Sequence, residues 1–127
     1  CIFLRASSFT SDISQWQTGN VTDMRSMFCN AYSFTSDLSQ WQTGNVTNMG
    51  GMFSSFTSDL SQWQTGNVTD MRSMFCNASY AHSFTSDLSQ WQTGNVTNMI
   101  YMFCNASSFN SDLSQWQTGK VTNMYRM

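Results

Sequence analysis

Apolar residues recur along this chain at spacings that mix two periods. Over residues 21–28 they fall at i, i+3, i+6 and i+7, which predicts one stripe of a helical turn. These residues are Val21, Met24, Met27 and Phe28. The stretch Ser11–Ser14 alternates polar and apolar residues and predicts a short strand. Residues 18–20 lie between the two segments and predict a turn, since they include glycine and asparagine.

The same pattern is repeated along the whole chain. The string SQWQTG occurs five times, and its tryptophans are 22 to 28 residues apart. The predicted units are 9–33, 34–55, 56–83, 84–108 and 109–127, of which the last is cut short, and residues 1–8 match the tail of a preceding unit. We expect residues 1–127 to form a single repeat array that is a piece of a longer one, because no polar capping unit is visible.

A period near 25 residues falls within the ~20–29 residues of leucine-rich repeats. One unit is too small to bury its apolar set alone, so neighbouring units must stack. The sequence therefore predicts an α/β solenoid, a leucine-rich-repeat-like right-handed coil. Each unit would contribute one short parallel β-strand and one helical or 3-10 turn.

Composition narrows the possible functions. Charged residues are 9% of the 127 and the net charge is −2, which gives no basic patch for a nucleic acid. No apolar run is long enough to span a membrane. The chain has a single histidine, His82, so no catalytic site that needs a histidine can recur in the repeats. The sequence also brings no nucleophile, base and orienting group together. We therefore expect a protein that is not an enzyme and that uses no cofactor.

The repeated motif SF-T-S-D-L-S-Q-W-Q-T-G-N-V-T-N-M-x-x-MF resembles the repeats of BspA-like leucine-rich-repeat surface proteins, and most closely the mycoplasma-type surface lipoprotein repeat. The residues that carry the resemblance best are Phe109, Asn110, Asp112, Leu113, Ser114, Trp116, Val121 and Met124. The resemblance implies an extracellular or cell-surface array used in adhesion or protein binding. Its partner would be a surface protein or a carbohydrate.

Aspartates recur at one phase of the repeat. In a parallel stack, neighbouring carboxylates about 5 Å apart would repel by about 0.8 kcal/mol even in water. Either a cation bridges the column, or each carboxylate accepts hydrogen bonds within its own turn. With the serines two positions later they form the predicted binding face: Asp12, Ser14, Asp37, Ser39, Asp59, Ser61, Asp87, Ser89, Asp112 and Ser114.

Six sequons suit a secreted protein that carries glycans, although asparagine also favours turns and caps. The candidate glycosylation sites are Asn20, Asn45, Asn67, Asn77, Asn95 and Asn105.

Cysteines follow the Met-Phe pair in three units, at Cys29, Cys76 and Cys104. They predict an interior column, with Cys76 and Cys104 close enough for a disulfide as the alternative. Zinc is not expected, because no C-x-x-C and no second histidine exist.

The methionine, phenylalanine and tryptophan columns predict the core, and a sugar-binding aromatic strip is the alternative for the tryptophans.

Three function classes remain: a non-catalytic binding module, a structural spacer array, and an ice-binding surface. The last would use threonine columns that begin at Thr18 and Thr22.

Two units differ in length from the others, and the difference lies after the Met-Phe pair. These departures predict a notch beside Ser54 and an exposed bulge at residues 80–82, as the one irregular surface for a specific partner.

Overall fold

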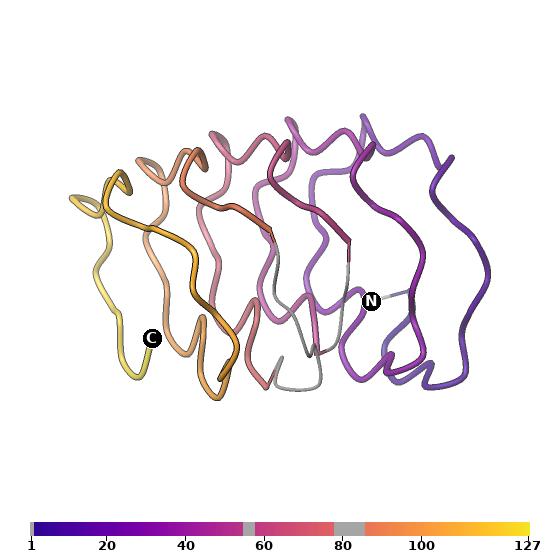
Figure 1. The fold of residues 1–127 in the computed structure, drawn as a ribbon. Helices are drawn as coiled ribbons and strands as arrows, with labels where there is room; N and C mark the ends of the chain where they lie inside the picture. The colour runs from indigo at the N-terminus through magenta and orange to yellow at the C-terminus, as the bar shows by residue number, and fades with distance from the viewer. Residues whose placement is uncertain (1, 55–57, 78–85) are drawn as a thin grey trace.

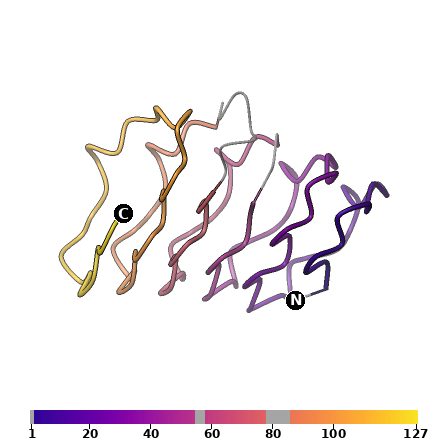
Figure 2. The same cartoon turned by 90° about the horizontal axis from the view of Figure 1, so that it is seen from below.

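The chain winds through successive coils that are stacked side by side (Figure 1). Figure 2, seen from below, shows the same order, with the N-terminal coils at one end of the stack and the C-terminal coils at the other. The structure is a computed structural model and describes residues 2–54, 58–77 and 86–127. Within these ranges there is no helix, and the only β-structure consists of isolated bridges.

Each coil is built from β-turns that follow one another along the chain. In such a turn the backbone N–H of residue i+3 donates to the carbonyl of residue i. In the third unit the turns join Leu60 to Trp63, Thr65 to Val68, and Met71 to Met74, at N–O distances of 3.0–3.2 Å. All six of these side chains are buried. A turn therefore brings its first and last residues to the same side of the coil, which is the inside.

Neighbouring coils pair in parallel through isolated bridges. The bridged pairs are Asp23 with Asn48, Asn48 with Asp70, Asp70 with Asn98, and Asn98 with Asn123. Backbone bonds flank each bridge: Thr47 N–H donates to the Thr22 carbonyl at 2.8 Å, and Met24 N–H donates to the Asn48 carbonyl at 2.9 Å. A second parallel bridge joins Phe28 to Phe53.

The predicted α/β class is wrong, because the described residues contain no helix and only single bridges in place of strands. The helical stripe over 21–28 is instead a β-turn, in which Met27 N–H donates to the Met24 carbonyl at 3.2 Å, flanked by bridged residues. Apolar residues three apart face the same way both on a helix and across a β-turn. The i, i+3 spacing therefore fits both structures.

The predicted strand at Ser11–Ser14 is also wrong in place. Its backbone forms no bridge to the next coil, and Ile13 N–H donates to the Ser36 hydroxyl at 2.9 Å instead. The parallel bridges lie at the phase of Asp23, within the segment predicted to be helical.

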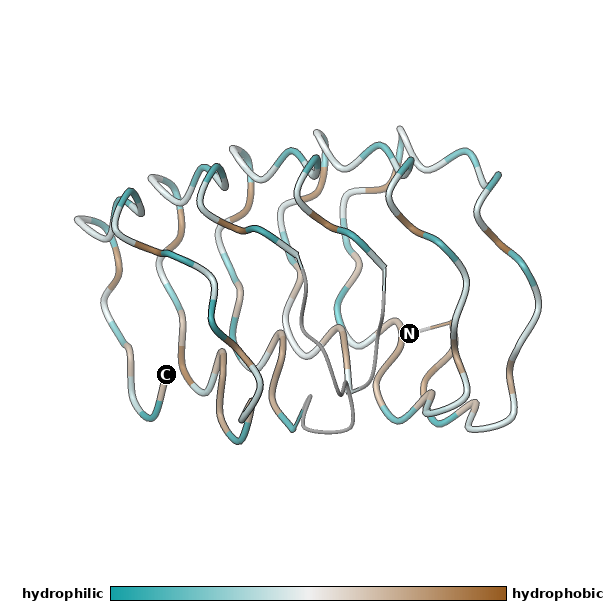
Figure 3. Cartoon of the chain, in the orientation of Figure 1, coloured by the Kyte–Doolittle hydropathy of each residue, from teal (hydrophilic) through white to brown (hydrophobic). Residues whose placement is uncertain are grey.

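The core is a set of columns that run through the stack, and Figure 3 shows hydrophobic segments recurring at matching places in successive coils. Phe3, Phe28, Phe53, Phe75 and Phe103 stack in sequence, with neighbouring ring centroids 5.5–5.9 Å apart. Methionines, leucines, valines and tryptophans fill the parallel columns. The prediction that the Met, Phe and Trp columns form the core is confirmed by their burial in the inner coils.

Buried polar groups find their partners on adjacent coils. The indole N–H groups of Trp41, Trp63, Trp91 and Trp116 donate to carbonyls of the preceding coil at 2.9–3.1 Å. The buried Thr43 hydroxyl donates to the Gln64 carbonyl at 3.1 Å and accepts from Gln64 N–H at 2.9 Å. Among the described residues, no buried side-chain nitrogen or oxygen lacks a partner.

Of the two units with unusual lengths, the structure describes the altered segment only in part. Ser54 takes the phase that cysteine holds elsewhere, and its buried hydroxyl accepts from Asn30 N–H at 3.0 Å. The bulge predicted at residues 80–82, which includes His82, lies outside the described residues.

The indole bond between coils can be tested by Trp63→Phe. The Trp63 indole donates to the Leu38 carbonyl at 3.0 Å, and both side chains are buried. Losing that donor and leaving a buried acceptor should lower the free energy of unfolding by about 1–3 kcal/mol, measured in urea. Trp16 is 46% exposed and makes no indole bond within the described residues, so Trp16→Phe should change stability by less than about 0.5 kcal/mol. Equal losses for both variants would contradict the role of the bond.

One β-turn begins at Met24, and an equivalent turn begins at the corresponding methionine of each later coil. The third residue of this turn has a positive φ and lies in the left-handed region. The φ angles are 53° at Ser26, 60° at Gly51, 52° at Ser73 and 55° at Tyr101. Only Gly51 avoids the clash between Cβ and backbone that this region imposes on other residues.

Gly51→Ala should therefore lower the free energy of unfolding by about 1 kcal/mol. A Cβ at Gly51 would lie 3.4 Å from the Ser26 hydroxyl, an ordinary contact, so the cost comes from the backbone conformation. Gly119 has no heavy atom within 4 Å of the equivalent position and no positive φ. Gly119→Ala is the matched control, and a loss of the same size there would exclude the conformational cause.

Candidate functional site

The aspartates and serines of the predicted binding face lie in one turn of each coil. In every case the aspartate Oδ1 accepts from the backbone N–H of the serine two residues later, at 2.8–2.9 Å. The pairs are Asp12–Ser14, Asp37–Ser39, Asp59–Ser61, Asp87–Ser89 and Asp112–Ser114. The described residues contain no group of three or more His, Cys, Asp or Glu side chains placed to hold a metal ion. These carboxylates thus serve as turn acceptors.

Serines of the next coil complete the environment of the aspartates. The Ser58 hydroxyl donates to Asp37 Oδ1 at 3.0 Å and accepts from Leu38 N–H at 2.6 Å. The backbone N–H of Ser39, followed by the hydroxyls of Ser39 and Ser58, lowers the pKa of the Asp37 carboxyl. Hydrogen bonds from Ser14 lower the pKa of Asp12 in the same way. The carboxylate is therefore stabilised in its charged form while it joins two coils.

Glutamines form two further columns beside this face. The first glutamine of each SQWQTG string donates from Nε2 to the hydroxyl of the preceding serine, at 3.2–3.4 Å; the donors are Gln15, Gln40, Gln62, Gln90 and Gln115. The second glutamine lies over a glycine of the preceding coil, and a Cβ added to Gly44 would meet Gln64 Oε1 at 2.5 Å.

In the first string, Gln17 donates from Nε2 to the Gln15 carbonyl at 3.5 Å. The other four side-chain amides of this second column make no hydrogen bond among the described residues. They belong to Gln42, Gln64, Gln92 and Gln117, and all four residues are exposed. Each amide carries two donors and one acceptor oxygen. The stack therefore presents one row of unused carboxamides, with one member on each of four successive coils.

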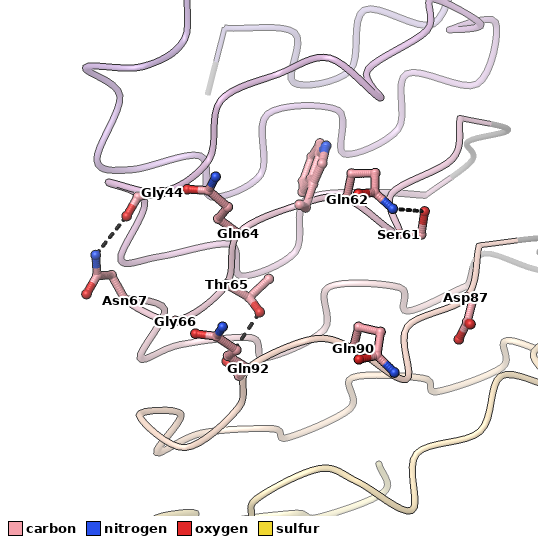
Figure 4. Close-up of a pocket in the computed structure, with 11 residues that line it drawn as sticks. Gly44, Ser61, Gln62, Gln64, Thr65, Gly66, Asn67, Asp87, Gln90 and Gln92 are labelled. Atoms are coloured by element: carbon pink, nitrogen blue, oxygen red, sulfur yellow. Dashed lines mark hydrogen bonds between the residues drawn. The ribbon is translucent and has the colours of Figure 1, made fainter.

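A hollow of about 690 Å³ lies between the two glutamine columns (Figure 4). Gln62 and Gln90 lie on one side of it, and Gln64 and Gln92 lie on the other side, where Thr65 is between these two glutamines. A second hollow of about 600 Å³ continues along the stack and is framed by Gln90, Gln92, Gln115 and Gln117. Smaller hollows beside Gln40 and Gln42 extend the surface toward the N-terminal coils. We call this continuous surface of glutamine carboxamides the glutamine face.

The glutamine face offers hydrogen-bond donors and acceptors. Its members are neutral amides, and the charged residues at its borders are Asp87 in the first hollow and Lys120 in the second. None of the expectations drawn from the sequence included these glutamines. The signal was the Gln-Trp-Gln order: a buried tryptophan between two glutamines directs both amides outward.

The sequon asparagines include several that already bond to the neighbouring coil. Asn45, Asn67 and Asn95 donate from Nδ2 to the carbonyls of Gly19, Gly44 and Gly66 at 2.7–2.8 Å. At the second sequon phase, Asn105 Nδ2 donates to Asn77 Oδ1 at 2.8 Å. Asn20 is exposed and makes no side-chain bond among the described residues. Glycosylation of these sites stays a prediction.

The two threonine columns behave differently. Thr18, Thr43, Thr65 and Thr93 are buried and bond to the next coil. The exposed column keeps its hydroxyls engaged as well: Thr47, Thr69, Thr97 and Thr122 each donate to the carbonyl of the preceding threonine at 3.0–3.2 Å. The first column therefore offers no surface lattice.

Cys29, Cys76 and Cys104 are half-buried free thiols, so the structure contains no Cys76–Cys104 disulfide. Burial, followed by the neighbouring Cys104, raises the pKa of the Cys76 thiol. A raised thiol pKa lowers the fraction of reactive thiolate.

A separate hollow of about 390 Å³ lies between Arg25 and Arg72, with Gly50 on its floor. Each arginine pairs with the aspartate two residues before it; Arg25 Nε is 3.0 Å from Asp23 Oδ2. Arg72 donates from Nε to Asp70 Oδ2 at 2.8 Å. The flanking charges therefore largely cancel.

Comparison with known proteins gives one family. The model of the family described as "Mycoplasma protein of unknown function, DUF285" matches residues 1–81 and, in a second overlapping match, residues 54–127. No curated protein and no solved structure matches the chain. Within the described ranges, no helix has the length and apolar character needed to cross a membrane.

The lowered pKa of Asp37 makes stability depend on pH. A carboxyl with a folded pKa below its ordinary value of 3.8 stabilises the fold above that value and loses this contribution as the pH falls through the folded pKa. Asp37→Asn keeps an acceptor oxygen and removes the charge. Its melting temperature should therefore fall less than the parent's between about pH 5 and about pH 2. Gln40→Asn changes no titratable group and should copy the parent's profile. Parallel profiles for Asp37→Asn and the parent would contradict the assignment.

Proposed function

The chain belongs to the DUF285 family, and from this premise we propose that it is a non-catalytic binding module of a cell surface that contacts its ligand through the glutamine face. The likeness of its motif to BspA-like leucine-rich-repeat surface proteins supports an extracellular or cell-surface location. That likeness also supports a role in adhesion, with a surface protein or a carbohydrate as the partner.

The observation that carries this proposal is the row of unused carboxamides at Gln42, Gln64, Gln92 and Gln117. Many of the other recurring polar side chains bond to the stack itself, among them those of Ser58, Thr43 and Asn67. Exposed groups with free donors and acceptors at fixed intervals are suited to recognition, since forming their bonds to a ligand costs no bond within the protein.

The aspartates favour a binding module over a hydrolase. Asp12, Asp37 and Asp87 have lowered pKa values because serine N–H and hydroxyl groups bond to them. A general acid at neutral pH needs a raised pKa.

The main competing function is a structural spacer, which the similarity of the units supports. A spacer needs only the stack and predicts no ligand for the glutamine face. The ice-binding alternative is weakened, because four members of one threonine column are buried: Thr18, Thr43, Thr65 and Thr93.

Binding to intact cells tests the proposal. Fluorescently labelled protein should bind cultured animal cells or bacteria saturably, measured by flow cytometry. The double variant Gln64→Ala/Gln92→Ala should bind about tenfold less. Its melting temperature should match the parent's, because neither amide makes a hydrogen bond among the described residues.

Arg72→Gln is the control, since it changes an exposed side chain that lines the separate arginine hollow. It should bind like the parent. Absence of saturable binding to either kind of cell, or binding that the double variant retains in full, would overturn the proposal and leave the spacer function.

A further inference from the structure

We propose that the glutamine face binds a neutral linear polysaccharide, laid along the stack with about one sugar residue for each coil. This inference rests on the proposed function and names its ligand class. It is carried by three features of the face: the chemistry of its free groups, their repetition, and the lack of fixed charge among them.

The free groups suit sugar hydroxyls. A carboxamide offers an acceptor oxygen and two N–H donors side by side. Gln64 and Gln92 can therefore each accept from one hydroxyl and donate to the adjacent hydroxyl of the same sugar ring. Every hydroxyl of a sugar is itself both a donor and an acceptor, so a row of identical amides is matched by a row of identical sugars.

The repetition favours a polymer over a single sugar. Gln90 and Gln92 line both of two successive hollows; Gln62 and Gln64 of the preceding coil also line the first, and Gln115 and Gln117 of the following coil also line the second. Paired backbone segments lie about 5 Å apart. This interval is roughly the length of one sugar residue in an extended chain. Weak contacts on successive coils then add within one ligand.

The lack of charge favours a neutral polymer over an acidic one. The first hollow contains no arginine or lysine and has Asp87 at its border. Lys120, the cation beside the second hollow, donates to Asn95 Oδ1 at 2.7 Å. An acidic polysaccharide would need a row of cations, which this face does not provide.

A peptide ligand fits less well. Trp63 and Trp91 are 4% and 3% exposed, so the face has no apolar pocket for side chains. The backbone at Gln64 is not an open edge, since Gln64 N–H donates to the Thr43 hydroxyl and the Gln64 carbonyl accepts from it. Peptides bound by strand addition need such an edge. The burial of these tryptophans also excludes them as a stacking strip for sugars, so recognition falls to the amides.

Calorimetry with purified oligosaccharides tests the inference. The probes are neutral β-linked gluco-, manno- and chito-oligosaccharides, from disaccharides to hexasaccharides, with polygalacturonate and heparin as acidic comparisons. Affinity for at least one neutral series should rise with each added residue and level off at about four residues, the number of coils that carry a free amide. Gln64→Ala/Gln92→Ala should lower the affinity about tenfold, and Arg72→Gln should leave it unchanged.

Other outcomes would overturn the inference. If the protein binds an acidic polymer more tightly than any neutral series, and Arg72→Gln abolishes that binding, the binding site is the arginine hollow. Failure to bind any neutral series would exclude the polysaccharide, while the proposed function stands if cell binding is still lost in the glutamine double variant. Cell binding that survives periodate, which cleaves vicinal diols, and disappears after protease treatment would identify a protein ligand.

Discussion

The whole structure depends on hydrogen bonds between adjacent coils. Within one coil the backbone hydrogen bonds of the described residues close tight turns, so the remaining buried polar groups need partners from outside the coil. The next coil provides them: the Trp63 indole donates to the Leu38 carbonyl, and the Ser58 hydroxyl joins Leu38 N–H to Asp37. A polar side chain that makes few bonds within its own unit thus satisfies a buried backbone group of the adjacent unit once the two units stack. This explains why a chain so poor in charge and so rich in small polar residues keeps a well-packed core.

The same constraint decides which residues remain for function. Serine, threonine and asparagine are short, so at most positions their polar atoms reach only the adjacent backbone and are consumed there. Glutamine is longer by one methylene than asparagine. The amides of Gln64 and Gln92 reach the glycines of the preceding coil and lie against them; both residues are exposed, and neither amide makes a hydrogen bond among the described residues. Side-chain length thus separates the residues that hold the stack from those that face a ligand.

The sequence was sufficient to predict the core columns, because Phe28, Met49 and Trp63 recur at fixed phases and are buried. It was not sufficient to predict the local structure. Met24 and Met27 are three residues apart, as on a helix, but a single β-turn with a left-handed Ser26 produces the same inward pair. The glutamine face was missed for another reason. The Gln-Trp-Gln order indicates that both amides point outward, but whether an amide is bonded or free depends on the neighbouring coil.

Stacking identical units also limits the charge that any column can hold. Like charges about 5 Å apart repel by about 0.8 kcal/mol even in water. At the phase of Arg25 the next coils carry Gly50, Arg72, Ile100 and Tyr125, so the arginines are never on adjacent coils. At the bridged phase, aspartate on one coil always faces asparagine on the next. The one unbroken column of aspartates is that of Asp37, where serine hydrogen bonds favour the charged form. A recognition surface that must repeat on every coil is therefore built most readily from neutral donors and acceptors, and the glutamine carboxamide offers both.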